Sequence, residues 1–100
     1  MISKIVRYKC KTDKLSTVLE IIDVFVHEIK THDPETKYAV YRAGEFEFFH
    51  IMSFSSVDAE LKHRAASYTK EFVANLYPDC TKEVNTIDMT LYATTRFSKE

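Results

Sequence analysis

Side chains alternate strictly over residues 2–11, and this period of two predicts a β-strand. One side of that strand carries Val6, Tyr8 and Cys10, and the other carries Ile5, Arg7 and Lys9. The period then changes to three and four, which predicts an amphipathic helix of about 17 residues. Its apolar stripe is Leu15, Val18, Leu19, Ile22, Val26 and Ile29. We expect Thr12 or Asp13 to cap this helix and His32-Asp33-Pro34 to end it.

Two further strands are predicted over residues 37–42 and 46–54, joined by a turn at Gly44, where a positive φ is most useful. The second of these strands is mostly apolar on both sides, with Phe48, His50, Met52 and Phe54 on one and Phe49, Ile51 and Ser53 on the other. A second helix is expected from a cap at Ser55 or Ser56 to Tyr77-Pro78-Asp79. Its predicted buried stripe is Leu61, Ala65, Tyr68, Phe72, Val73 and Leu76.

The last strand is predicted over residues 83–94, and residues 96–100 read as a tail after a single domain of residues 1–95. The element order is therefore β-α-β-β-α-β. Right-handed crossovers place both helices on one face of a four-stranded antiparallel sheet whose first and third strands are central. The expected fold class is α+β, with a ferredoxin-like arrangement.

The two faces of this sheet are assigned by parity. The helices are expected to cover Ile5, Phe49, Ile51, Ile87, Met89 and Leu91. The face left open would carry Tyr8, Phe48, His50, Met52, Phe54 and Tyr92, together with Thr86, Asp88 and Thr90. Because a large open apolar face is unusual on a monomer, we expect a second copy to cover it. Two sheets would then close into a dimeric α/β barrel around a cavity.

Composition narrows the classes of function. The 100 residues contain fourteen Lys and Arg, fifteen Asp and Glu and one Gly, so neither a basic field for nucleic acid nor a Gly-rich phosphate loop is present. RNA-recognition domains share the element order, but the third strand lacks their Lys/Arg-Gly-aromatic opening. No apolar run is long enough for a bilayer, and the first residues do not resemble a secretory signal. The chain reads as cytoplasmic, with Cys10 and Cys80 as reduced thiols.

Three segments carry a resemblance to a known family. They are residues 48–54 (FFHIMSF), residues 59–64 (AELKHR) and residues 72–78 (FVANLYP), with Ser67 between the last two. Together they resemble the antibiotic biosynthesis monooxygenase family of dimeric α+β barrels, which includes enzymes of the quinol-monooxygenase type. The resemblance covers nearly the whole chain. It implies a homodimer and the cofactor-free oxidation of a small aromatic or quinol-type substrate by molecular oxygen. Branches that degrade haem or oxidise polyketide aromatics resemble one another in having a Trp in the site, and this chain has none.

His50 and His63 are the candidate catalytic residues. A neutral His50 imidazole in the cavity could take a phenolic proton and produce an anion that reacts with oxygen. The resemblance places His63 near the cavity mouth, where it would assist. The alternative roles are a hydrogen-bonded core histidine for His50 and a helix-boundary residue for His63. The expected substrate-binding residues are Tyr8, Phe48, Met52, Phe54, Asp88 and Tyr92.

Two alternatives remain open at this point. His50, His63 and either Asp88 or Asp58 would satisfy a site with two histidines and one carboxylate for iron, although no spacing enforces it. We therefore expect no metal and no cofactor. The same fold could also serve as a non-catalytic dimeric module that binds a small apolar molecule or only dimerises. Oxygen uptake separates the enzyme from such a module.

Overall fold

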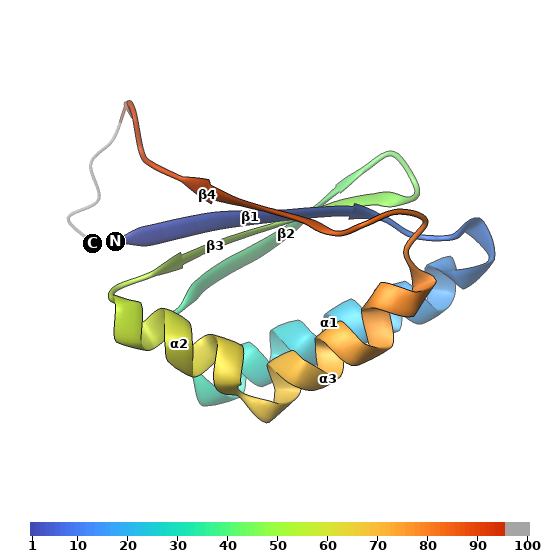
Figure 1. Ribbon diagram of the computed structural model, residues 1–100, viewed down its shortest axis with the longest axis horizontal. Coiled ribbons are helices and arrows are strands. Elements are labelled where there is room, and N and C mark those ends of the chain that lie inside the picture. The colour runs from blue at the N-terminus through green and yellow to red at the C-terminus, as the bar shows by residue number, and fades with distance from the viewer. Residues whose placement is uncertain (96–100) are drawn as a thin grey trace.

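The computed structural model describes residues 1–95 and has two layers, an antiparallel sheet and a layer of helices (Figure 1). The four strands are β1 (Ile2–Lys9), β2 (Lys37–Ala43), β3 (Glu47–Phe54) and β4 (Asn85–Met89), in the order β2-β3-β1-β4. The helices are α1 (Leu15–His32), α2 (Val57–Ala65) and α3 (Ser67–Leu76), with single 3-10 turns at Thr12–Lys14 and Tyr77–Asp79. The ferredoxin-like fold with β1 and β3 central is confirmed.

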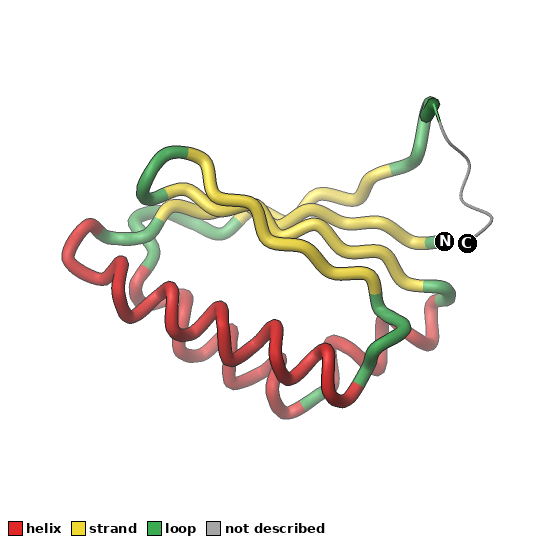
Figure 2. The backbone as a smooth tube through the Cα atoms, turned by 180° about the vertical axis from the view of Figure 1, so that it is seen from behind, coloured by secondary structure: helices red, strands yellow, loops and turns green. Residues whose placement is uncertain are grey.

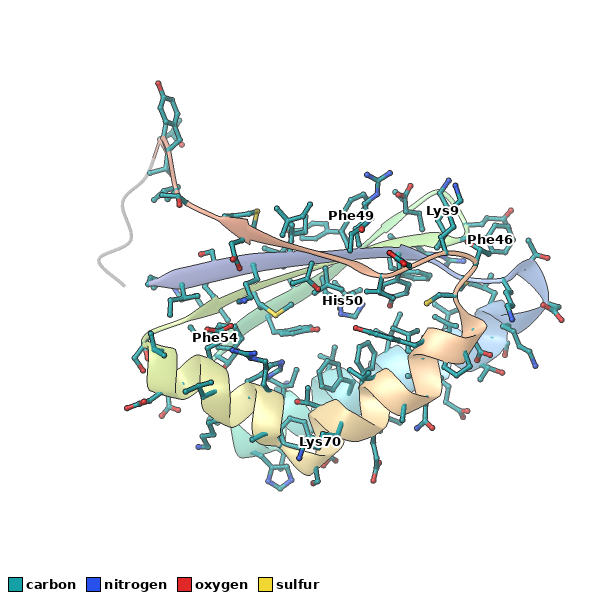
Figure 3. All side chains as sticks on the ribbon, viewed as in Figure 1. Lys9, Phe46, Phe49, His50, Phe54 and Lys70 are labelled. Carbon is teal, nitrogen blue, oxygen red and sulfur yellow. The ribbon has the colours of Figure 1, made fainter. Side chains whose placement is uncertain are left out.

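The assignment of the two sheet faces is wrong. The helices cover Tyr8, Phe48, His50, Met52 and Phe54, all of which are buried. Figure 3 shows His50 and Phe54 on the helix side of the sheet and Phe49 on the opposite side. The open face carries the set expected beneath the helices, including Ile5, Phe49, Ile51, Ile87 and Met89.

The third strand could not decide this question because it is apolar on both sides, and a strand with two similar faces specifies its orientation weakly. The first strand decides it. Val6 and Tyr8 pair with His50 and Phe48, whereas the opposite side of β1 includes Ser3 and Arg7. Burying Arg7 under the helices would cost far more than burying the tyrosine. The open side of β1 carries two charges, Arg7 and Lys9, whereas the helix side carries one, Lys4, whose Nζ pairs with Glu60 at 2.8 Å. The less charged side therefore turns toward the helices and takes the even positions of β3 with it.

Helix α1 buries the predicted stripe, and Phe25 joins Val18, Ile22 and Ile29 in the core. Each such side chain contributes about 1.5–3 kcal/mol on full burial. The predicted cap is wrong, since neither Thr12 nor Asp13 caps α1. The N-cap position is taken by Lys14, which makes no side-chain cap hydrogen bond. At the next helix the prediction is confirmed. The Ser56 hydroxyl accepts a hydrogen bond from the Ala59 amide at 3.1 Å and caps α2.

The predicted second helix is two helices. Ala66 has an extended backbone with ψ 142°, and the chain turns there between α2 and α3 (Figure 2). This break changes which residues are buried: Glu60 and His63 face inward from α2, while the predicted Leu61 is 49% exposed. In one continuous helix, the side chains of residues 60 and 72 would project in different directions from the helix axis, so both could not face the sheet. The break lets both short helices direct their own side chains toward the sheet.

The C-terminal strand is shorter than predicted, ending at Met89, so the predicted members Leu91 and Tyr92 lie beyond the sheet and are exposed. The predicted tail lies outside the described residues. Ahead of β4, the backbone of Cys80 pairs with that of Cys10 in an isolated antiparallel β-bridge. Both cysteines are free and buried, and burial raises the pKa of both thiols, that of Cys80 to about 11.

Candidate functional site

A pocket of about 330 Å³ lies between the sheet and the helices. Residues from β1, β2, β3 and all three helices line it, so the fold brings distant parts of the chain together there. Its apolar and aromatic lining residues are Val6, Phe25, Tyr38, Met52, Phe54, Phe72, Val73 and Tyr77. The polar lining residues are Lys4, Glu60, His63, Arg64, Thr69 and Thr86. An apolar concavity with a few polar groups is the usual form of a small-molecule site.

His63 is the titratable group best placed to act in this pocket. Its side chain is buried, and its Nδ1 has no hydrogen-bond partner among residues 1–95. Its ring centroid lies 5.2 Å from that of Phe54 and 5.9 Å from that of Tyr38. Burial lowers the pKa of His63, although nearby carboxylates oppose the shift. The imidazole is therefore neutral near pH 7 and able to accept a proton.

His50 is the centre of a buried hydrogen-bond chain. Its Nε2 lies 2.7 Å from Tyr8 Oη, and its Nδ1 lies 2.7 Å from Tyr38 Oη. The side chain is fully buried, and burial lowers the pKa of His50 to about 4. Both ring nitrogens are occupied by tyrosine hydroxyls and His50 is not part of the pocket lining. His50 therefore lies behind the pocket wall, where it contacts the lining residues Tyr38 and Phe72, the latter with ring centroids 5.5 Å apart.

Tyr38 connects the two histidines. Its ring centroid is 5.7 Å from that of His50 and 5.9 Å from that of His63, and it lines the pocket. Burial raises the pKa of the Tyr38 phenol, so its hydroxyl stays protonated. His63 and Tyr38 line the pocket, and His50 lies behind Tyr38. The two histidines thus belong to one site.

Thr69 supplies a further polar atom to the pocket. Its Oγ1 is buried and has no hydrogen-bond partner among the described residues. An unsatisfied buried hydroxyl costs about 1–3 kcal/mol, which a bound polar ligand can recover by accepting or donating a hydrogen bond. Together with His63, Thr69 gives the pocket two buried polar side chains that have no hydrogen-bond partner among residues 1–95.

One side of the pocket is closed by ion pairs. Lys4 Nζ lies 2.8 Å from Glu60 Oε2 and 3.0 Å from Asp88 Oδ1, and Arg64 lies 3.6 Å from the same Glu60 oxygen. The contact with Glu60, followed by that with Asp88, raises the pKa of Lys4. Since Glu60 is buried, its pairing with Lys4 offsets the cost of placing a carboxylate under the sheet.

The structure places the sequence-predicted site residues in three different positions. His63, Met52 and Phe54 line the pocket. Tyr8, Phe48 and His50 are buried but do not line it. Asp88 and Tyr92 do not line it either: the Asp88 side chain is 82% exposed at the Lys4 pair, and Tyr92 is 99% exposed. Tyr92 misses the pocket because the sheet ends before it.

Sequence reasoning did not select Tyr38, Thr69, Lys4 or Glu60. The signal for Tyr38 lies in the pairing of β2 with β3, which places Tyr38 opposite Met52 and Val40 opposite His50. Alternation then puts Tyr38 on the His50 side of the sheet. Thr69 and Glu60 carry no such signal, because their inward positions depend on the break at Ala66.

The alternative iron site is not formed. Across residues 1–95, no three His, Cys, Asp or Glu side chains are grouped closely enough to hold a metal ion.

In the same range, no helix combines the length and the apolarity needed to cross a bilayer. A second concavity, a groove of about 470 Å³ between α1 and α3, has none of the buried unsatisfied side chains found in the first. The pocket under the sheet is therefore the candidate site.

The sequence matches no protein-family model and no curated protein. Solved structures match it in shape. A structure described as an antibiotic biosynthesis monooxygenase has a TM-score of 0.84 at 16% identity, covering 93% of this chain and 100% of that chain. The chain shares its fold.

Two further structures lead to the same fold. Rv0793 from Mycobacterium tuberculosis has a TM-score of 0.83 at 16% identity, covering 95% of this chain and 98% of its own. A candidate antibiotic biosynthesis monooxygenase from Caulobacter crescentus has a TM-score of 0.83 at 17% identity, covering 92% of this chain and 90% of its own. At such identities the likeness to antibiotic biosynthesis monooxygenases is one of fold, and function has to be argued from the pocket.

Proposed function

We propose that this protein is a cofactor-independent monooxygenase that oxidises a small aromatic or quinol-type substrate with molecular oxygen. The observation that carries the proposal is the aromatic pocket in which His63 is buried, has no partner at Nδ1 among residues 1–95, and lies with its ring centroid 5.9 Å from that of Tyr38. The fold shared with antibiotic biosynthesis monooxygenases supports it.

The chemistry follows from these groups. The His63 imidazole accepts the phenolic proton, which leaves an electron-rich anion in an apolar cavity that oxygen can enter. The anion gives electrons to oxygen directly, so no resident cofactor is needed. One oxygen atom is retained by the ring and the other leaves as water, so that a quinol and one O2 give a hydroxyquinone and one water. This assignment moves the base from His50, the residue favoured by the sequence, to His63.

Oxygen consumption tests the proposal. We expect the protein to accelerate oxygen uptake by a reduced naphthoquinol above the rate of the same solution with heat-denatured protein. With heavy-isotope O2, mass spectrometry of the product should show one labelled oxygen atom. Binding of the quinol without accelerated uptake would contradict the enzyme and leave the non-catalytic binding module, the alternative drawn from sequence.

The open face of the sheet supports a second part of the proposal, that the protein is a homodimer. Ala39, Ile51, Ile5 and Ile87 are register partners, so an apolar row crosses all four strands on this face. Arg7 lies over the Phe49 ring, with its guanidinium carbon 5.6 Å from the ring centroid. A second copy covering this face would bury the row while leaving the pocket on the other side of the sheet.

Ile51→Asp is expected to break such a dimer. Sedimentation of the wild-type protein should give a mass near twice 11.7 kDa, and the variant should approach 11.7 kDa because a carboxylate would be buried in the interface. The solvent-exposed Val24→Asp substitution on α1 is the matched control and should remain dimeric. A wild-type protein that stays monomeric as its concentration rises would contradict the proposed dimer.

A further inference from the structure

We propose that Tyr8 and His50 act as positioning residues, fixing the hydroxyl hydrogen of Tyr38 toward the pocket so that Tyr38 donates a hydrogen bond to the anionic oxygen of a bound phenol. The inference rests on the proposed substrate class and adds a specific role for a buried chain of three residues from β1, β3 and β2. His50 thereby controls the pocket without lining it.

The direction of the hydrogen bonds follows from counting donors and acceptors. A neutral imidazole has one N–H donor and one acceptor nitrogen, and here each nitrogen lies 2.7 Å from a tyrosine oxygen. Two arrangements are possible. Either Tyr8 donates to Nε2 and Nδ1–H donates to Tyr38, or Tyr38 donates to Nδ1 and Nε2–H donates to Tyr8.

The different positions of the two tyrosines select the first arrangement. Tyr38 is half-buried and lines the pocket, where water or a ligand can accept its hydrogen, whereas Tyr8 does not line it. Tyr8 is 2% exposed and its ring is stacked on Phe48, with centroids 5.6 Å apart. Among residues 1–95, His50 Nε2 is the only hydrogen-bond partner of its hydroxyl. If Nε2 carried the hydrogen, the Tyr8 O–H would be buried without an acceptor, at a cost of a lost hydrogen bond. Tyr8 therefore donates to Nε2, which places the imidazole hydrogen on Nδ1.

The consequence appears at the pocket. Once Nδ1–H donates to Tyr38 Oη, the Tyr38 hydrogen cannot point at His50 and is left for a ligand. A phenol that loses its proton to His63 becomes an anion beside this donor, and a hydrogen bond to a charged oxygen is stronger than one to a neutral oxygen. The pocket therefore favours a phenolate over the corresponding phenol.

The tautomer of His50 can be tested directly in the wild-type protein. Two-bond proton–nitrogen NMR distinguishes an imidazole protonated at Nδ1 from one protonated at Nε2. We expect the Nδ1–H form for His50 at neutral pH. Observation of the Nε2–H form would overturn the proposal, because Tyr38 would then point its hydrogen away from the pocket. This measurement requires no substitution.

The effect on ligands is tested with para-nitrophenol, whose absorbance separates the phenol from the phenolate. We expect wild-type protein to bind the phenolate preferentially, lowering the pKa of the bound ligand. Tyr38→Phe and Tyr8→Phe should each reduce the preference for phenolate by about tenfold, the value of one charged hydrogen bond. His50→Gln, which offers an amide acceptor and an amide donor, should retain more of the preference than His50→Leu.

Affinity for para-nitroanisole, which has no ionisable hydroxyl, serves as the control and should be unchanged in Tyr8→Phe. An unchanged phenolate preference in Tyr8→Phe, with a reduced one in Tyr38→Phe, would contradict the positioning role. Failure of wild-type protein to bind para-nitrophenol would contradict it as well. If the phenolate binds as expected but quinols consume no oxygen, the oxygenase proposal is wrong and the positioning role stands.

Discussion

His63→Ala is expected to lower kcat/KM for quinol oxidation by about two to three orders of magnitude, the usual contribution of a positioned acid–base group. His63 is buried in the pocket, its Nδ1 has no partner in the described chain, and no other histidine lines the cavity. Without it, the phenolic proton has no neutral base to accept it, and formation of the reactive anion becomes rate-limiting.

The measurement is oxygen uptake by the wild-type and variant proteins over a range of quinol concentrations and pH. Because burial lowers the pKa of His63, activity should be constant at neutral pH and decline only below the ordinary histidine range, as the imidazole becomes protonated. His27→Ala, a substitution at an exposed position on α1, is the matched control and should retain wild-type activity. Equal activities of the two variants would show that His63 is not the base.

The second large effect concerns stability. We expect the free energy of unfolding to fall as the pH is lowered from about 6.5 toward about 4, because the pKa of His50 is 6.5 when unfolded and about 4 when folded. Between these values the unfolded chain binds a proton that the folded chain excludes, so acid favours unfolding. Above pH 6.5 the contribution is fully present. The loss from this group approaches about 3 kcal/mol, a large share of the 5–15 kcal/mol typical of a domain.

Urea unfolding at a series of pH values measures this effect. His50→Gln should be less stable than wild type at pH 7, since an amide fits the two tyrosine hydroxyls less well than an imidazole. It should also lose less stability between pH 6.5 and pH 4. His63 contributes with the same sign in both proteins, so the difference between the two curves isolates His50. If the stabilities of the two proteins fell in parallel as the pH was lowered, His50 would not be the source of the pH dependence.

The element order and most element positions could be predicted from sequence because the local periods are strong. The stripe of α1 and the Ser56 cap are local features, and both are confirmed. The failures arise where a local signal is missing or where pairing with a distant strand overrides it. Alanine is not a helix-breaking residue, so the sequence around Ala66 does not predict the extended backbone that separates α2 from α3. The strand after Cys80 ends at Met89 although its alternation continues, because β1 begins at Ile2 and pairing stops at Ser3.

The candidate site, too, could be predicted only in part from the sequence. His63 and the aromatic character of the third strand were visible in the sequence, and so was the interest of His50. The chain from Tyr8 through His50 to Tyr38 was not, because its members lie 42 and 12 residues apart and meet only through the registers of β1 and β2 with β3. We propose the base at His63 and not at His50 for the same reason, since a sequence does not show which side chain is enclosed by its neighbours.

What the sequence determined by itself is the ferredoxin-like order of strands and helices, through alternation in the strands and the apolar stripe of the first helix. What only the tertiary structure decided is which face of the sheet the helices cover. The third strand is apolar on both sides and fits either orientation, so the choice depended on its pairing with β1, which carries Arg7 and Lys9 on one side and only Lys4, paired with Glu60, on the other. That one choice places His50 inside the protein and leaves the isoleucine row on the open face.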